Sequence, residues 1–294
     1  MECPERDCYL ILCHNRPWQV NALSAYLAEQ GHEVFIHVDA SSPVQEQINT
    51  SARVHLVQNR VAVSWGSFSM IEAEMACIRA AAESGKEFRY VHLLSGQCLP
   101  AMNRRDSEQF LQESAQKRLQ FLSCTESPAE SGWGRDGILY RFAVWYPQFM
   151  VNRRSPWHRL FWKWVRLWKI LGLRRNWKPF APFHFGSQWW TLTYDCVKQI
   201  LSYVDTHPEY YDFFRHTFCS DEMFVQSCVM HLPGKDWQLV RAHKRFMIWH
   251  RGPSPQDITR EKWGEVRGSG CLFARKFSHE PGETEEYFRE LNAD

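Results

Sequence analysis

Two short charged strings in this 294-residue sequence could carry out chemistry, and the first is a pair of acids. Asp221 and Glu222 follow Ser220, a good N-cap, at the predicted start of a helix that runs to residue 231. The positive end of a helix favours the ionised form of a carboxyl group, and a general base must be ionised to accept a proton. From these residues alone, the simpler interpretation is that both acids only stabilise the helix start.

The second string is a pair of cations, Arg275 and Lys276, between Phe273 and Phe277. A basic pair near the end of a chain is usually solvated, but apolar neighbours indicate a strand that holds the pair in place. Fixed cations can stabilise the charge that develops on a departing diphosphate.

Several common catalytic motifs are missing from the sequence. It contains no G-x-S-x-G elbow, no phosphate-binding P-loop and no H-E-x-x-H, and no G-x-G-x-x-G follows the first predicted strand, which argues against a dinucleotide cofactor. D-x-D is missing as well, although many nucleotide-sugar enzymes hold Mg²⁺ or Mn²⁺ with such carboxylates. A nucleotide-sugar site in this chain would therefore need fixed cations in place of a metal.

The net charge of +2 conceals one basic segment in an otherwise acidic chain. Residues 150–190 hold nine of the 35 Lys and Arg residues and none of the 33 Asp and Glu residues. A nucleic-acid-binding protein would have a broader basic surface, so this pattern argues against nucleic acid and favours a local contact with anionic lipid.

The sequence shows no clear membrane span, signal peptide or cysteine motif. The longest apolar runs fall far short of the roughly 18 residues of a membrane span, and the first residues do not resemble a signal peptide. We therefore expect a cytoplasmic protein, or a Golgi-lumen protein if the sequence has been trimmed of an anchor.

The ten cysteines form no C-x-x-C pair, so buried reduced thiols are expected.

Strands and helices alternate over about the first 125 residues, which predicts an α/β fold. Strands are expected at 8–13, 34–38, 54–57, 90–94 and 119–122, with helices at 17–30, 67–82 and 107–114. Further on, we expect a loop at 127–145, strands at 186–193, 245–249 and 271–274, and helices at 195–204 and 220–231. Ligands of such sheets bind beyond the carboxyl ends of the strands, near Asn15, His37 and Asp39. No linker is evident, so we predict a single domain over residues 1–294.

Seven strings, in this order, resemble glycosyltransferase family 14, the core-2/I-branching β-1,6-N-acetylglucosaminyltransferases and peptide O-xylosyltransferases. They are HVD (37–39), SWGSFSM (64–70), LLSGQCLP (93–100), GSQWWTLT (186–193), SDEMF (220–224), RFMIWHRGPSP (245–255) and LFARKF (272–277). The resemblance runs from about residue 8 to 277 and is weakest over 127–185. It implies a GT-A-like, Rossmann-type, mostly parallel sheet flanked by helices, and an inverting, metal-independent enzyme.

The resemblance also assigns site residues. Glu222 matches the catalytic Glu of the family, the single general base that inversion requires. Lys276 matches a diphosphate-binding cation, and Arg275 is a weaker match for a second one. Asp39 matches a nucleotide-contacting Asp, although it could be a plain turn residue.

Other matches concern the two sugars. Trp65 matches an aromatic residue near the donor, with a core Trp as the alternative, and Ser95 and Gln97 lie in the loop that lines the sugar pocket of relatives. Many relatives have Asp at the position of Cys98, so the donor-sugar contacts differ here. On the acceptor side the candidates are Gln188, where xylosyltransferases have Asp, and Trp249, which could also belong to the core.

We therefore expect an inverting, metal-independent glycosyltransferase that moves a sugar, with N-acetylglucosamine favoured, from a UDP-sugar to a hydroxyl of an acceptor glycan. A β-linkage would form, in bacterial surface-polysaccharide synthesis. Residues from about 1 to 125 would bind the nucleotide sugar, and those from about 126 to 294 would bind the acceptor and provide the base. The alternatives are UDP-xylose as donor, or a non-catalytic, membrane-associated glycan-binding protein with the same fold.

Residues 150–180 predict an amphipathic helical insertion. At helical spacing, one face would consist of Trp157, Phe161, Trp164, Trp168 and Leu171. Arg159, Lys163 and Arg166 fall on another face, as in helices that lie in an anionic membrane interface. A core helix with a solvated basic face is the alternative. In the family register this stretch belongs to the acceptor side, so it is expected to dock a peripheral enzyme on the inner face of the membrane, where a lipid-linked acceptor can reach Glu222.

Overall fold

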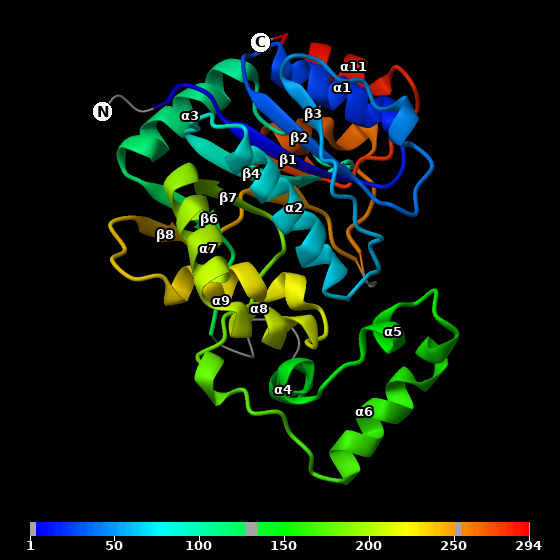
Figure 1. The fold of residues 1–294 in the computed structure, drawn as a ribbon. Helices are drawn as coiled ribbons and strands as arrows, with labels where there is room; N and C mark the ends of the chain where they lie inside the picture. The colour runs from blue at the N-terminus through cyan, green and yellow to red at the C-terminus, as the bar shows by residue number, and fades with distance from the viewer. Residues whose placement is uncertain (1–3, 127–133, 251–253, 294) are drawn as a thin grey trace.

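A central seven-stranded sheet organises the computed structural model, which describes residues 4–126, 134–250 and 254–293 (Figure 1). In spatial order its strands are β3 (Val54–Leu56), β2 (Glu33–Val38), β1 (Cys8–Cys13), β4 (Tyr90–Ser95), β7 (Trp190–Thr193), β6 (Leu119–Leu122) and β8 (Gln238–Val240). In the part of the chain that the structure describes, β7 runs antiparallel to both neighbours and the other pairings of this sheet are parallel. The predicted mostly parallel, GT-A-like α/β architecture is confirmed.

Alternating side chains of the strands supply two hydrophobic cores, one on each face of the sheet. Leu10 of β1 points into the core beneath α2 (Ser69–Glu83), α7 (Tyr194–Thr206), α8 (Pro208–Arg215) and α9 (Phe224–His231). Tyr9 and Ile11 point into the core beneath α1 (Pro17–Ala28), α3 (Arg104–Gln116), α10 (Trp263–Arg267) and α11 (Glu283–Leu291). The sheet is thus covered on both sides, as its continuous apolar strands require.

A second, three-stranded sheet belongs to the α1 side of the molecule. It consists of β5 (Leu99–Pro100), β10 (Phe273–Arg275) and β9 (Arg245–Met247). Phe273 and Ala274 are buried in the core beneath α1, so the basic pair that follows them is fixed to the body of the protein, as its apolar neighbours predicted.

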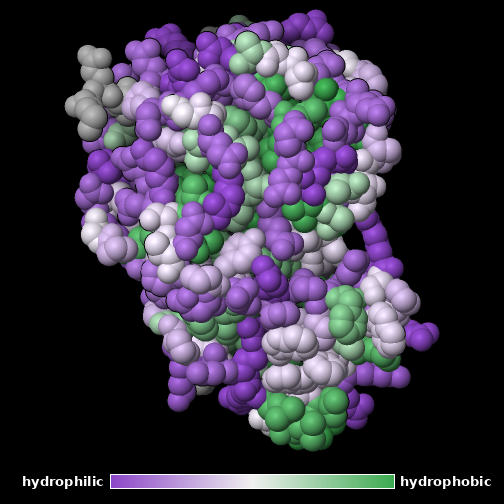
Figure 2. Space-filling view, viewed as in Figure 1, coloured by the Kyte–Doolittle hydropathy of each residue, from purple (hydrophilic) through white to green (hydrophobic). Residues whose placement is uncertain are grey.

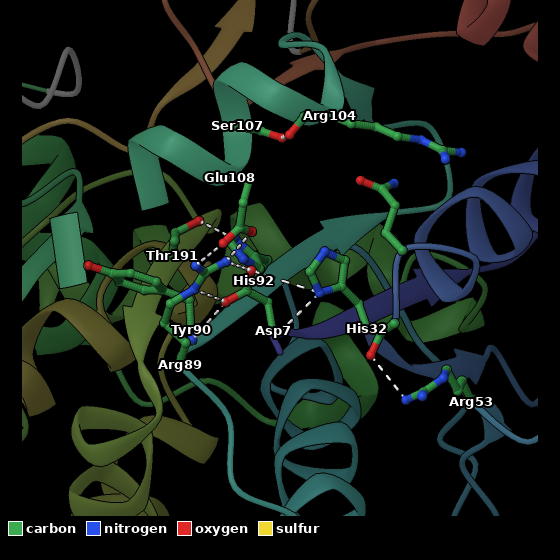
Figure 3. Close-up of polar contacts among 12 residues, drawn as sticks. Asp7, His32, Arg53, Arg89, Tyr90, His92, Arg104, Ser107, Glu108 and Thr191 are labelled. Atoms are coloured by element: carbon green, nitrogen blue, oxygen red, sulfur yellow. Dashed lines mark hydrogen bonds and ion pairs between the residues drawn. The ribbon is translucent and has the colours of Figure 1, made fainter. Parts of the chain in front are cut away.

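An ion-pair network closes the amino-terminal edge of the main sheet (Figure 3). Arg89, just before β4, donates from Nε and Nη2 to the two carboxylate oxygens of Asp7, at 3.0 and 2.7 Å. Its Nη1 also donates to Glu108 of α3 at 2.6 Å. Asp7 is fully buried and Arg89 is almost so, so these bonds replace the water that both charges give up.

Three local predictions were wrong. Residues 134–143 of the expected loop form α4 (Gly134–Ala143), and residues 127–133 lie outside the described residues. The expected strand at 186–193 begins only at Trp190. Ser220 caps no helix: Ser220–Glu222 form a 3₁₀ turn, α9 begins at Phe224, and the buried Ser220 hydroxyl has no partner among the described residues.

The nine cysteines in the described ranges are free thiols, and eight are buried, as expected. No helix in those ranges is long and apolar enough to cross a bilayer.

The basic, Trp-rich insertion forms an arm, which we define as residues 148–175. It contains α5 (Gln148–Val151), a 3₁₀ turn (Pro156–Leu160) and α6 (Phe161–Ile170), and α6 extends away from the sheet (Figure 1). A small separate core joins the arm to the body through the buried side chains of Val144, Tyr146, Val151 and Phe161.

The predicted membrane-facing stripe was wrong in detail. Phe161 is only 2% exposed because it packs on Tyr146 and Phe218, and Trp164 and Trp168 are partly buried against the same small core. The exposed apolar side chains of the arm are Trp157 and Leu171 of the predicted stripe, together with Phe149, Trp162, Leu167, Ile170 and Leu173. They include the hydrophobic (green) lower tip of Figure 2, where Figure 1 places the end of α6.

Candidate functional site

A cavity of about 950 Å³ lies at the carboxyl-terminal edge of the parallel strands. His14 follows β1, Asp39 follows β2, Ser95 ends β4 and Ser123 follows β6, and all four line it. This is the edge at which open α/β sheets bind ligands. The nine candidate site residues predicted from the sequence all line this one cavity: Asp39, Trp65, Ser95, Gln97, Gln188, Glu222, Trp249, Arg275 and Lys276.

Glu222 sits in the cavity wall with one carboxylate oxygen held by a cation that the sequence did not suggest. Arg141 of α4 donates from Nη1 to Glu222 Oε2 at 2.5 Å. The Arg141 side chain is 4% exposed and that of Glu222 is 33% exposed, so the carboxylate reaches the cavity from a buried support. The orienting charge is therefore Arg141 rather than the helix start that we expected.

The backbone of Glu222 is held by the neighbouring segment that begins at Gly186. Gly186 N–H donates to the Glu222 carbonyl oxygen at 3.0 Å. A Cβ atom on Gly186 would lie 1.8 Å from the carbonyl oxygen of Ser123, the residue after β6. Only glycine therefore allows the 186–189 segment to pass so close to the end of β6 and to reach the 3₁₀ turn of Glu222.

Two further acids, Asp221 and Glu74, lie close enough to affect one another's ionisation. Burial and the neighbouring Glu222 raise the pKa of Asp221 to about 7, although Arg141 opposes the shift. Burial raises the pKa of Glu74 on α2 to about 8, although its Oε1 accepts from Trp190 Nε1 at 2.9 Å. Glu74 is therefore mostly protonated at neutral pH, and Asp221 is protonated in part.

The cations Arg275 and Lys276 both line the cavity, but their surroundings differ. The Arg275 guanidinium carbon lies 4.3 Å from the centre of the Trp189 ring. The Lys276 ammonium has no ion pair or hydrogen bond with the part of the chain that the structure describes. Lys276 is thus the freer of the two to meet an anionic ligand.

The donor-side residues Asp39 and Gln97 line the cavity and also make hydrogen bonds that hold the surrounding loops. Asp39 Oδ1 accepts from the backbone N–H groups of Ser41 and Val63 at 2.8 and 3.3 Å, so Asp39 also shapes its own turn. Gln97 Nε2 donates to Ser278 Oγ at 3.1 Å, which ties the loop after β4 to the segment after β10. Cys98, within that loop, is fully buried, so the departure from relatives at this position is not exposed to the cavity.

The two aromatic candidates are not core residues. Trp65 is 46% exposed and Trp249 is 54% exposed, and both rings border the cavity. Gln188 lines the cavity at 8% exposure, and its Nε2 is buried without a partner among the described residues.

Sequence reasoning missed Arg141, Arg154 and His243, which also line the cavity. Arg141 lay in the expected loop, and Arg154 was counted as part of a lipid-facing segment. His243 carried no motif. Burial lowers its pKa to about 4, with Arg245 and Arg275 adding to the effect, so it is neutral at physiological pH.

The described residues contain no group of three or more His, Cys, Asp or Glu residues that could hold a metal ion.

A search of curated proteins gave no match to this chain. The sequence model of the Core-2/I-branching enzymes does match, over residues 8–268, and so covers the arm and most of the cavity lining, but not Arg275 and Lys276. The chain therefore belongs to the Core-2/I-branching enzyme family, a family of glycosyltransferases.

Proposed function

We propose that the protein transfers a sugar, with N-acetylglucosamine favoured, from a UDP-sugar to a hydroxyl of an acceptor glycan with inversion of the anomeric centre. The observation that supports this most strongly is that a partly exposed carboxylate, Glu222, and an unpaired ammonium group, Lys276, line one cavity. A base and a leaving-group cation are the two parts that such a displacement needs.

The chemical step can be written with these residues. The Glu222 carboxylate accepts the proton of the acceptor hydroxyl while its oxygen forms a bond to the anomeric carbon. The bond between that carbon and the diphosphate breaks on the other side, and the electron pair leaves with UDP. Lys276, with Arg275 beside it, stabilises the added charge on the diphosphate. The β-linkage follows because attack and departure occur on opposite faces of an α-linked donor.

We propose that this step needs no divalent metal, because lysine and arginine supply the positive charge at the cavity. Trp249 offers a flat, exposed ring suited to the apolar face of a sugar, and Gln188 lies in the wall of the same cavity.

We further propose that the arm docks the enzyme on an anionic bilayer, such as the cytoplasmic face of a bacterial membrane, so that a lipid-linked acceptor reaches the cavity. The arm exposes Trp162 and Ile170, each 70% accessible, and the 150–190 segment combines nine cations with no acid. Apolar side chains surrounded by cations match a surface of anionic head groups over a hydrocarbon layer.

The proposal is tested by measuring UDP release from UDP-N-acetylglucosamine, UDP-xylose and UDP-glucose in excess EDTA, with free and lipid-linked oligosaccharides as acceptors. We expect turnover of UDP-N-acetylglucosamine in EDTA, with Glu222→Gln slower by roughly 10²- to 10⁴-fold. Glu46→Gln, an exposed acid outside the cavity, is the matched control.

The possible outcomes separate the parts of the proposal. Activity that EDTA removes and Mn²⁺ restores would disprove the metal-free step. Preference for UDP-xylose would change the donor, and donor binding without turnover would favour a glycan-binding role. Full activity of Glu222→Gln would show that another group is the base.

A further inference from the structure

The root of the arm lies at the rim of the catalytic cavity. The Arg153 guanidinium carbon is 3.8 Å from the centre of the Trp65 ring, and the Arg153 N–H donates to Ser64 Oγ at 3.4 Å. Trp65 itself lines the cavity. The turn that connects α5 to the outer part of the arm is therefore attached to the donor side of the site.

This attachment brings the next residue, Arg154, into the lining of the same cavity. Its backbone N–H donates to Asn152 Oδ1 at 2.9 Å, which fixes the turn. The pKa of His14 is lowered first by burial; Asp39 raises it, and Lys276 and Arg154 both lower it. Arg154 and Lys276 thus act on the same imidazole and lie in the same region of the cavity.

The other two arginines of the cavity are occupied. Arg141 is held by Glu222, and the Arg275 guanidinium stacks on Trp189. The side chains of Arg154 and Lys276 make no ion pair or hydrogen bond with the described residues. A diphosphate carries at least two negative charges, more than a single lysine neutralises.

We propose that Arg154 is a donor-binding residue that contacts the diphosphate of the nucleotide sugar together with Lys276. This inference rests on the proposed function, because it takes a nucleoside diphosphate as the ligand. A guanidinium can make two parallel hydrogen bonds to phosphate oxygens, which Lys276 cannot. The arm would then form one wall of the donor site as well as a membrane contact.

The test compares Arg154→Gln with Arg105→Gln, an exposed arginine on α3 outside the cavity. UDP binding is measured by titration calorimetry and uridine binding by ligand-observed NMR, both without vesicles. We expect Arg154→Gln to weaken UDP binding by roughly tenfold and to leave uridine binding unchanged, because uridine has no phosphate. Arg105→Gln should match the wild type for both ligands, and Arg154→Lys should recover part of the loss.

UDP affinity of Arg154→Gln within twofold of the wild type would overturn the inference and leave the proposed function standing. An equal loss for UDP and uridine would also overturn it, since the change would then have disturbed the nucleoside pocket. If the wild-type protein binds no UDP, both the inference and the proposed donor are wrong.

Discussion

The guanidinium of Arg141 lies 2.5 Å from the carboxylate of Glu222, and the two groups come from α4 and from the turn before α9. The arginine is buried and the glutamate faces the cavity, so Arg141 sets the direction of the carboxylate that we assign as the base. Removing the guanidinium should therefore affect the chemical step more than donor binding.

We predict that Arg141→Met lowers kcat by about 10²-fold with a change of less than threefold in the KM for the donor. Arg141→Lys should retain part of the rate, since it keeps a positive charge without the planar fork. Steady-state kinetics on variants with native circular dichroism provide the measurement. A kcat within twofold of the wild type in Arg141→Met would mean that the ion pair does not orient the base.

Gly186→Ala is predicted to distort the site. The new Cβ would meet the backbone oxygen of Ser123 at 1.8 Å, so the segment that bonds to the Glu222 backbone must shift. We expect at least a tenfold loss of kcat and a loss of stability of about 1–3 kcal/mol. Gly264→Ala is the control, because a Cβ there meets nothing within 4 Å and alanine favours the helix. Wild-type activity in Gly186→Ala would show that the segment moves freely.

Glu74 should make the protein less stable as pH rises between about 4.5 and 8, whereas buried histidines with lowered pKa values, such as His92 and His243, act in the opposite direction. The pKa of Glu74 is raised from 4.5 to about 8 in the fold, so the folded chain holds a proton that the unfolded chain releases. That contribution is fully present below the unfolded pKa and is lost as pH rises through this window.

Glu74→Gln keeps an acceptor for Trp190 Nε1 and removes the titration. We predict that the unfolding free energy at pH 8, relative to that at pH 5, is higher in this variant than in the wild type by an amount on the order of 2 kcal/mol. Urea unfolding at the two pH values measures it. An identical pH dependence in both proteins would mean that Glu74 is ionised in the folded state.

In the ion-pair network of Figure 3, the Arg89–Asp7 pair should matter more for stability than the Arg89–Glu108 pair. Arg89→Met leaves Asp7 buried without its guanidinium partner, and we predict a loss of about 3–5 kcal/mol. Glu108→Gln removes a partner whose side chain is 50% exposed, so its loss should stay below about 1 kcal/mol. Equal losses in the two variants, measured by urea unfolding, would contradict this division.

Membrane binding should depend on the exposed tip of the arm and not on Phe161, Trp164 and Trp168, which pack inward. The double variant Trp162→Ser, Ile170→Ser is predicted to lose flotation with vesicles of phosphatidylcholine and phosphatidylglycerol, which the wild type should bind. Neutral vesicles should bind the wild type more weakly, because they lack the charge that attracts Lys163 and Arg166. Equal binding to both vesicle types would exclude the electrostatic part of the proposal.

Much of the sheet could be predicted because its strands carry their own signal. Residues 8–13 form an apolar run that is buried on both faces, and the observed β1 has the predicted bounds. By contrast α4 was missed, because Gly134 and Gly137 look like loop signals and the helix depends on packing such as that of Phe142 in the core beneath α2. Tertiary contacts overrode local propensity there.

In the candidate site, too, some residues could be predicted from the sequence and others could not. Residues within the family motifs, such as Asp39 and Glu222, could be placed in one cavity from their order in the sequence. Arg141 and Arg154 lie in the stretch where the resemblance is weakest, and only the folded chain brings them to that cavity. Likewise, helical spacing identified the apolar stripe of α6, but it could not show that Phe161 in this stripe packs against Phe218 of the body.

The position of β7 has a consequence for how the protein is made. In the main sheet β6 lies between β7 and β8, and both of these partners are synthesised much later in the chain. On the ribosome β1, β2, β3 and β4 can pair as they emerge, whereas β6 must wait until residues 190–193 arrive to bridge it to β4. During that interval β4 and β6 both present open edges, which invite pairing with other chains. The arm and α4 are translated within this interval, so lengthening the insertion would prolong the exposure and reduce the yield of soluble protein.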